Sequence, residues 1–476
     1  MPPTLPSARR RLLTAWCCVV AATALGATGA DTPLADAAKQ QDWDLVRTLV
    51  AQGTDTDSSQ PDGATALHWA AYWNNEEVLA LLTDAGANVN AANDYGATPL
   101  WTACANRHGH AVSWLLDAGA DPDHGLRSGE TPLMRCAHTG DPIAIRSLIA
   151  HGADINATEP ERGQTALMRA VANQHADVTQ ALLEAGAALN IRTSAVQQLR
   201  GTGERSTTSP QGSTYFNAGG FTALLFAARH GDIHSTRWLL DAGADVNDAG
   251  ADGNSALVLA AMSGHERLAQ YLLERGADPD ADGAGYTALH AAVLRTQPGL
   301  IKSLLDHGAN VNVPLVKSTP VPRWTYQHIF VRRETGATPL LLAAKYLEPT
   351  LVRLLADAGG DVLLPLDDGT TALMAAVGLG LSRSTTRRNR LIAPELVAAE
   401  WNNGAQVLAT VQAVLDAGAK VALDAVGRSG NTALHTAARN RFSAAADLLL
   451  ASGANADIQN ENGTTARELL DRLKPN

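Results

Sequence analysis

The sequence predicts an all-α solenoid of helix-turn-helix units, joined by short β-hairpin or loop fingers. Two observations predict this fold. The phrase TALH begins at Thr65, Thr287 and Thr432, and variants such as TPLW at Thr98 and TPLM at Thr131 recur along the chain. Most neighbouring phrases begin about 33 residues apart, as Thr65, Thr98 and Thr131 do. A fixed period of this length indicates stacked repeats, each of which buries its apolar face against its neighbours.

Each part of the repeat has a local structural reason. Thr98 and Thr131 are followed by Pro, the pattern of an N-cap hydroxyl with Pro at the first helical position. Ala pairs such as Ala70–Ala71 follow and allow close helix packing. Gly86 and Gly243 follow the second helix, where a left-handed residue ends it. Helices of about ten residues are marginal alone, so stacking must stabilise them.

The 33-residue period with T-P-L-H-x-A resembles the ankyrin repeat. The resemblance covers residues 31–476, with an N-terminal cap at 33–60, ten full repeats and a C-terminal cap at 463–476. It implies two antiparallel helices per repeat and a finger between repeats. It also implies a curved array whose concave face is formed by the fingers and the first helices.

Residues 1–30 differ from the repeats and read as a secretory signal peptide. Arg9, Arg10 and Arg11 precede an apolar run from Leu12 to Leu25, and small residues at Thr28 and Ala30 follow. We expect cleavage after Ala30 and a periplasmic or extracellular location. Both the general secretory and the twin-arginine routes fit this leader. A run of this length is short for a membrane anchor, so no stable membrane insertion is expected after cleavage.

The charge and the cysteines limit the partners and the redox chemistry. The leader contains three of the 37 basic residues and none of the 48 acidic ones, so the mature chain is strongly acidic. We therefore expect no nucleic-acid partner. Cys104 and Cys136 lie in consecutive first helices, one position out of register. Because packed helices lie about 8–10 Å apart and a disulfide needs Cα atoms within about 7 Å, we expect two free, buried thiols.

Three intervals exceed the period, which predicts insertions at about 191–217, 313–335 and 380–405. The first two replace fingers, and the third separates the two helices of one repeat. The second insertion alternates aromatic side chains, and we predict binding residues there: Trp324, Tyr326, Phe330 and Arg332. The alternative is that these aromatics pack on the adjacent finger. The insertions are rich in Arg, which indicates either an acidic partner or neutralisation of the protein's own carboxylates.

The resemblance also places binding residues on the concave face, just after the Ala pairs. These are Tyr72, Trp73, His138, Arg229, His230, Arg295, Lys345 and Tyr346. Tyr72 and Trp73 stand out because large exposed aromatics need a reason, although burial of Trp73 beneath the N-terminal cap is the alternative. Trp114 and Trp238 occupy equivalent places in second helices, and we predict both in the core.

The sequence contains no recognisable catalytic, cofactor or metal motif. Three of the 14 His residues, His68, His290 and His435, belong to the repeat phrase, where this imidazole usually bonds between repeats. We therefore expect no catalytic residues, no cofactor and no bound metal.

Two functions fit this reading. The first is a monomeric, non-enzymatic, exported scaffold that binds a protein or peptide through its concave face and fingers. The second is a small-molecule or carbohydrate site, with or without catalysis, roofed by the two finger insertions. An enclosed pocket with converging polar groups favours the second, and an open groove favours the first.

Overall fold

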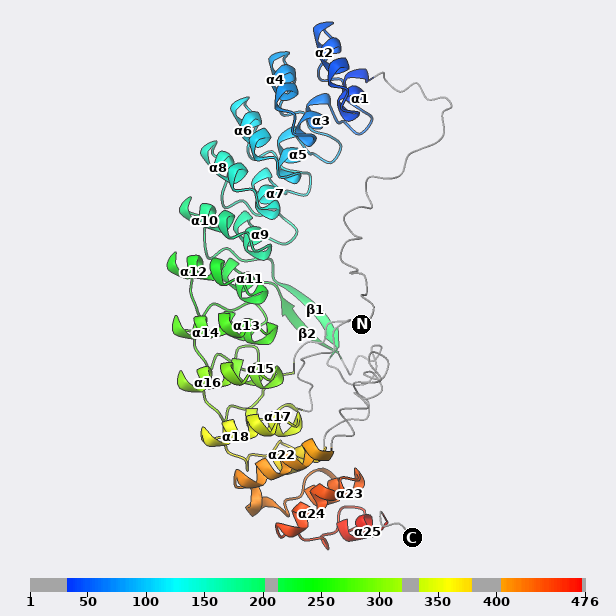
Figure 1. The fold of residues 1–476 in the computed structure, drawn as a ribbon, viewed down its shortest axis with the longest axis vertical. Coiled ribbons are helices and arrows are strands. Elements are labelled where there is room, and N and C mark those ends of the chain that lie inside the picture. The colour runs from blue at the N-terminus through cyan, green and yellow to red at the C-terminus, as the bar shows by residue number, and fades with distance from the viewer. Residues whose placement is uncertain (1–31, 202–212, 319–333, 379–403, 473–476) are drawn as a thin grey trace, which may run out of the picture.

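The computed structural model describes residues 32–201, 213–318, 334–378 and 404–472 of the 476-residue chain. It shows a curved stack of short helical pairs, which confirms the predicted all-α solenoid of ankyrin type (Figure 1). First helices line the inner side of the curve and second helices line the outer side. We call these the inner row and the outer row.

The bounds of the elements follow the repeat. The inner row consists of α1 (Pro33–Lys39), α3 (Ala66–Tyr72), α5 (Pro99–Ala105), α7 (Pro132–Thr139), α9 (Ala166–Ala172), α11 (Ala223–His230), α13 (Ala256–Ser263), α15 (Ala288–Leu294), α17 (Pro339–Lys345), α19 (Ala372–Ala376), α23 (Ala433–Arg439) and α25 (Ala466–Asp471). The outer row consists of α2 (Trp43–Ala51), α4 (Glu76–Asp84), α6 (Gly109–Asp117), α8 (Pro142–Ala150), α10 (Ala176–Glu184), α12 (Ile233–Asp241), α14 (Glu266–Glu274), α16 (Pro298–Asp306), α18 (Pro349–Asp357), α22 (Gly404–Asp416) and α24 (Ser443–Ala451). Two 3-10 turns lie at Ala419–Ala422 and Arg428–Gly430.

The caps of the helices are those that the sequence predicts. Thr98 and Thr131 accept hydrogen bonds through Oγ1 from the backbone N–H groups three residues on, and Pro follows each at the first helical position. Gly86 and Gly243, which follow outer helices, have φ of +91° and +95°. An added Cβ would be strained there, which explains Gly at this place in the repeat.

One continuous apolar core runs along the stack, between the two rows. Small residues such as Ala103 and Ala137 are fully buried in the inner row, and Leu115 and Leu148 are fully buried in the outer row. Because a short helix buries too little surface alone, each pair depends on its neighbours for stability.

Two further bonds repeat along the stack. Neighbouring fingers share backbone bonds, as from Arg127 N–H to Tyr95 O at 3.1 Å. The loops after the outer helices share Asx bonds, as from the Asp278 N–H to Asn247 Oδ1 at 2.7 Å.

The cysteine prediction is wrong, because Cys104 in α5 and Cys136 in α7 form a disulfide. Their Cα atoms lie 4.7 Å apart, well inside the limit for a bridge. The 8–10 Å separation used in the prediction is typical of larger side chains at the contact. Inner helices approach more closely because Ala residues line their interface. The one-position offset in register therefore does not keep the sulfur atoms apart.

The core assignment of Trp114 is also wrong. Its side chain, on the outer helix α6, is 40% exposed, and Trp238 on α12 is only partly buried. The outer row packs against the inner row on one side and leaves the other side in water. A large side chain in the outer row can therefore lie partly in solvent.

Candidate functional site

The first finger insertion forms a β-hairpin on the inner side of the curve (Figure 1). Strands β1 (Val196–Gly201) and β2 (Ser213–Ala218) pair antiparallel, with Leu199 opposite Tyr215. These two side chains are 59% and 67% exposed. The insertion thus adds an apolar, solvent-facing surface beside the inner row.

The base of this hairpin is tied to the next finger by Arg192. Its guanidinium donates to Gly220 O at 3.0 Å and to Ala249 O at 2.9 Å, and it forms an ion pair with Asp248. Arg192 therefore neutralises one of the protein's own carboxylates. This agrees with the interpretation that Arg residues of the insertions pair within the protein and do not recruit an acidic partner.

The predicted aromatic pair lies at the N-terminal end of the inner row. The rings of Tyr72 and Trp73 meet edge to face at 4.8 Å, and Trp69 meets Tyr72 at 5.7 Å. Trp73 is 39% exposed, so it is not buried beneath the N-terminal cap. The ammonium of Lys39 lies 5.0 Å from the centre of the Trp69 ring.

Of the other predicted inner-row residues, three lie partly or fully in solvent in the middle of the array. His138, Arg229 and His230 are exposed, and Asn173 Nδ2 donates to His138 Nδ1 at 3.0 Å. Burial and the neighbouring Arg135 and Arg169 lower the pKa of His138. Burial and Arg229 lower the pKa of His230.

Three other predicted binding residues are used by the protein itself. Arg295 is partly buried and donates from Nε to Met262 O at 2.7 Å. Lys345 Nζ and the Tyr346 hydroxyl both donate to Glu334 Oε1, at 2.8 and 2.9 Å. Burial, followed by the Glu334 charge, raises the pKa of Tyr346 well above its usual value. Lys345 and Tyr346 therefore anchor the end of the second insertion. The four residues predicted within that insertion, Trp324, Tyr326, Phe330 and Arg332, lie outside the described residues.

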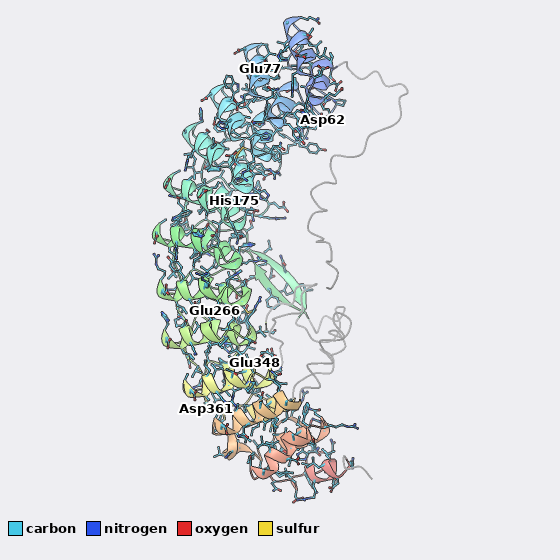
Figure 2. All side chains as sticks on the ribbon, in the orientation of Figure 1. Asp62, Glu77, His175, Glu266, Glu348 and Asp361 are labelled. Carbon is cyan, nitrogen blue, oxygen red and sulfur yellow. A yellow bond between two sulfur atoms is a disulfide. The ribbon has the colours of Figure 1, made fainter. Side chains whose placement is uncertain are left out.

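The repeat histidines bond between repeats, as the sequence predicts. His68 Nε2 lies 2.9 Å from Ala97 O, and His290 and His435 make the equivalent contacts to Ala337 O and Thr464 O. A second set of histidines also bonds between repeats. His108, His175 and His265 lie directly before the outer helices α6, α10 and α14, and each bonds to a backbone oxygen of the preceding repeat, as His175 Nε2 does to His138 O at 3.0 Å. His175 is labelled in Figure 2.

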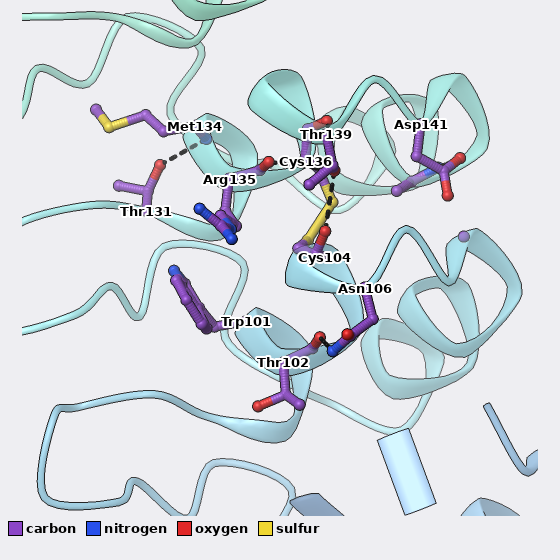
Figure 3. Close-up of a disulfide and its surroundings, with 12 residues drawn as sticks. Trp101, Thr102, Cys104, Asn106, Thr131, Met134, Arg135, Cys136, Thr139 and Asp141 are labelled. Carbon is purple, nitrogen blue, oxygen red and sulfur yellow. Dashed lines mark hydrogen bonds between the residues drawn. A yellow bond between two sulfur atoms is a disulfide. The ribbon is translucent and has the colours of Figure 1, made fainter. Parts of the chain in front are cut away.

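The inner row also carries functional candidates that the sequence did not single out. Trp101 stands at a position that holds His, Met, Leu or Val in other repeats, and Arg135 and Arg169 occupy one repeat position in α7 and α9. The guanidinium of Arg135 lies 5.1 Å from the centre of the Trp101 ring (Figure 3). The sequence signal that could have identified Arg135 and Arg169 is their charge, because later repeats have the apolar residues Phe226 and Leu259 at the same position.

Two negative findings concern the described residues only. None of their helices has both the length and the apolar character required to cross a bilayer. They also contain no group of three or more His, Cys, Asp or Glu side chains placed to hold a metal ion.

Comparison with known proteins agrees with the geometry. A family model described as "Ankyrin repeats (3 copies)" matches residues 34–125, 119–193 and 224–314, and one described as "Ankyrin repeat" matches 429–461. Mouse "Ankyrin repeat and SOCS box protein 16" is 31% identical over 202 residues, which are 39% of this chain and 40% of that protein. Human "Ankyrin repeat and SOCS box protein 6" is 37% identical over 113 residues, 22% of each chain.

The chain thus spans two fifths or less of the length of these curated relatives. The crystal structure of the human ASB11 ankyrin repeat domain is 28% identical, with a TM-score of 0.42, and the match covers 52% of this chain and 99% of that one. Ankyrin repeats are modules that generally mediate protein–protein interaction. The family models match more than half of the chain, which therefore belongs to the ankyrin-repeat family.

Proposed function

We propose that this chain is an exported, non-enzymatic scaffold that binds a protein or peptide through its inner row and its enlarged fingers. The observation that carries the proposal is that an aromatic side chain of the inner row and the apolar side chains of the hairpin beside it are exposed on the same side of the array. Trp73 on the inner row and Leu199 and Tyr215 on the hairpin all face solvent. Exposed aromatic side chains on a rigid scaffold are typical of interaction surfaces.

The experiment compares two tryptophans of equal exposure. Trp73 is 39% exposed on the inner row, and Trp114 is 40% exposed on the outer row. Proteins captured by the mature chain from the source cells are identified by mass spectrometry, with wild type, Trp73→Ala and Trp114→Ala in parallel. A partner lost with Trp73→Ala and kept with Trp114→Ala supports the proposal. Equal loss with both variants, or with neither, contradicts binding through the inner row.

The role of the fingers is tested by deletion. Residues 196–218 or 313–335 are replaced by a short finger of the length found in other repeats. We expect each deletion to weaken capture of the same partner, because both segments are insertions at finger positions of the repeat. Full capture after both deletions would leave the inner row as the whole interface.

Export is supported by two independent features. Residues 9–30 have the pattern of a cleavable leader. Disulfides persist mainly in oxidising compartments, and this chain forms Cys104–Cys136. Mass spectrometry of the protein recovered from the periplasm or the medium should find a new N-terminus after Ala30. Full-length chain confined to the cytosol would contradict export.

A further inference from the structure

The inner row contains an unusual group of unsatisfied hydrogen-bond donors. Among the described residues, five buried side-chain nitrogen or oxygen atoms have no partner. Three are donors on the successive inner helices α5, α7 and α9, namely Trp101 Nε1, Arg135 Nε and Arg169 Nε. We call these three residues the donor cluster. A buried N–H without an acceptor costs about 1–3 kcal/mol, so three in one row need an explanation.

The cluster has a defined geometry. The Arg135 guanidinium lies over the Trp101 ring at 5.1 Å (Figure 3). Arg135 has no carboxylate within ion-pair distance among the residues that the structure describes. Arg169 uses Nη1 to bind Glu130 at 2.6 Å and leaves Nε free of any partner. The Nε atoms themselves are buried, but Arg135 is only partly buried as a residue and its guanidinium has no hydrogen-bond partner among the described residues, so it can still bind a molecule lying on the inner row.

The cluster contains two Arg residues beside one carboxylate, Glu130, although the protein as a whole is acidic. Arg135 and Arg169 both lower the pKa of His138, after burial, while Glu130 acts against them. The positive field of the two guanidinium groups thus reaches the same exposed imidazole. A local positive potential in an acidic protein favours an anionic ligand at this place.

The disulfide fixes the spacing of the first two members. Cys104 lies three residues after Trp101 in α5, and Cys136 directly follows Arg135 in α7. The Thr139 hydroxyl adds a bond across the same helices, to Cys104 O at 3.0 Å. Because the bridge holds α5 against α7, the stacked Trp101–Arg135 pair is ordered before a ligand binds, which lowers the entropic cost of binding.

We infer that the donor cluster binds carboxylate side chains of an extended acidic peptide. The inference rests on the proposed function and names the chemistry of its partner. Arg forms paired hydrogen bonds with carboxylates, and the indole N–H donates to an oxygen. Adjacent helices lie up to about 10 Å apart and an extended chain advances about 3.3 Å per residue. Acidic residues spaced about two to three apart would therefore meet successive repeats.

A selection experiment tests the inference with the full mature chain. Random twelve-residue peptides displayed on phage are selected against immobilised, oxidised protein, and the selected peptides are synthesised. We expect Asp and Glu to be enriched at intervals of about two to three. Arg135→Gln should weaken binding of these peptides about tenfold in fluorescence anisotropy, because one charge-assisted pair is lost.

The matched control is Arg237→Gln. Arg237 also lies over an aromatic ring, that of Tyr271 at 5.4 Å, but it belongs to the outer helix α12. We expect wild-type affinity from this variant. Arg135→Lys keeps the charge without the planar fork and should lose affinity less than Arg135→Gln. Circular dichroism and urea unfolding of all variants separate loss of binding from loss of fold.

The outcomes distinguish the inference from the proposed function. Selected peptides without acidic enrichment, or acidic peptides indifferent to Arg135→Gln, would overturn the inference and leave peptide binding intact. If a synthetic peptide binds only when phosphoserine replaces its Glu residues, the carboxylate assignment is wrong. Free glutamate that competes as strongly as the peptide would overturn the extended-peptide claim. If no peptide binds and Trp73→Ala changes no protein capture, both proposals are wrong.

Discussion

Two parts of the inner row use polar residues in opposite ways. At α17, Lys345 and Tyr346 donate to the buried Glu334, so their polar atoms are satisfied within the protein. At α5–α9, Trp101, Arg135 and Arg169 keep donors without partners. The difference shows that a concave position does not by itself make a binding residue. What matters is whether the protein supplies an acceptor of its own.

We call α17, where the polar groups bond within the protein, the closed region, and α5–α9, where donors lack partners, the open region. The largest expected effect tests the closed region. In the intact pair, the side chains of Glu334 and Lys345 are 4% and 10% exposed. Replacing Glu334 by Ala therefore leaves a charged, nearly buried Lys345 without this carboxylate. Breaking one partner of a buried ion pair costs about 3–5 kcal/mol. We expect a loss of this size in the free energy of unfolding, measured in urea. Hydrogen exchange should locate the loss at α17 and the neighbouring finger.

The matched variant is Glu130→Ala in the open region. Glu130 pairs with Arg169 at 2.6 Å, with side chains 14% and 18% exposed. Because this pair is less deeply buried than Lys345–Glu334, we expect a smaller loss of about 1–2 kcal/mol. Equal losses from the two variants would contradict the distinction between the closed and open regions.

The second effect concerns the disulfide of the open region. Replacing both Cys104 and Cys136 by Ser removes a bridge between residues 32 apart in sequence. Loops of this length are stabilised by about 2–4 kcal/mol. We expect a lower urea midpoint, with faster hydrogen exchange in α5 and α7. Adding reductant to the wild type should reproduce the shift and leave the double variant unchanged.

The limits of sequence reasoning are clear at these two places. The period, the Thr-Pro caps and the Gly ends are local signals, so the repeat could be predicted in detail. The disulfide could not, because it depends on how closely Ala residues let α5 approach α7. The ion pair of Lys345 could not be predicted either, because its partner Glu334 is 11 residues away in an insertion that follows no repeat pattern.

The third effect is a dependence of stability on pH at His290. Burial lowers its pKa from 6.5 to about 4. Its Nδ1 accepts from the Thr287 N–H at 3.2 Å, and protonation would remove that acceptor. The folded state therefore favours the neutral ring. The contribution of the neutral His290 ring to the free energy of unfolding is fully present above about pH 6.5 and is lost as the pH falls toward 4. At pH 5 we expect a loss of about 2 kcal/mol in urea unfolding.

His290→Gln serves as the test variant. Gln at this position of a capping box can still accept from the N-cap backbone. The variant should be less stable at pH 7, because it loses the bond to Ala337 O, and its stability should fall less between pH 7 and 5. Replacing the exposed His307 of the same repeat by Gln should leave the wild-type slope. An unchanged slope in His290→Gln would assign the pH dependence to another group.

The smallest expected effect on stability comes from a change at the base of the first finger insertion, which differs in burial from the base of the second. Glu334 at the base of the second is buried, whereas Arg192 at the base of the first is 47% exposed where it pairs with Asp248. Exposed ion pairs contribute about 0–1 kcal/mol, so Arg192→Ala should barely change the urea midpoint. Its three contacts nevertheless join the hairpin base to the next finger. Amide exchange in β1 and β2 should therefore quicken while the inner helices keep wild-type rates, because a two-stranded hairpin is marginal without support. If exchange in the hairpin stays at the wild-type rate, the two strands hold their place through contacts other than Arg192.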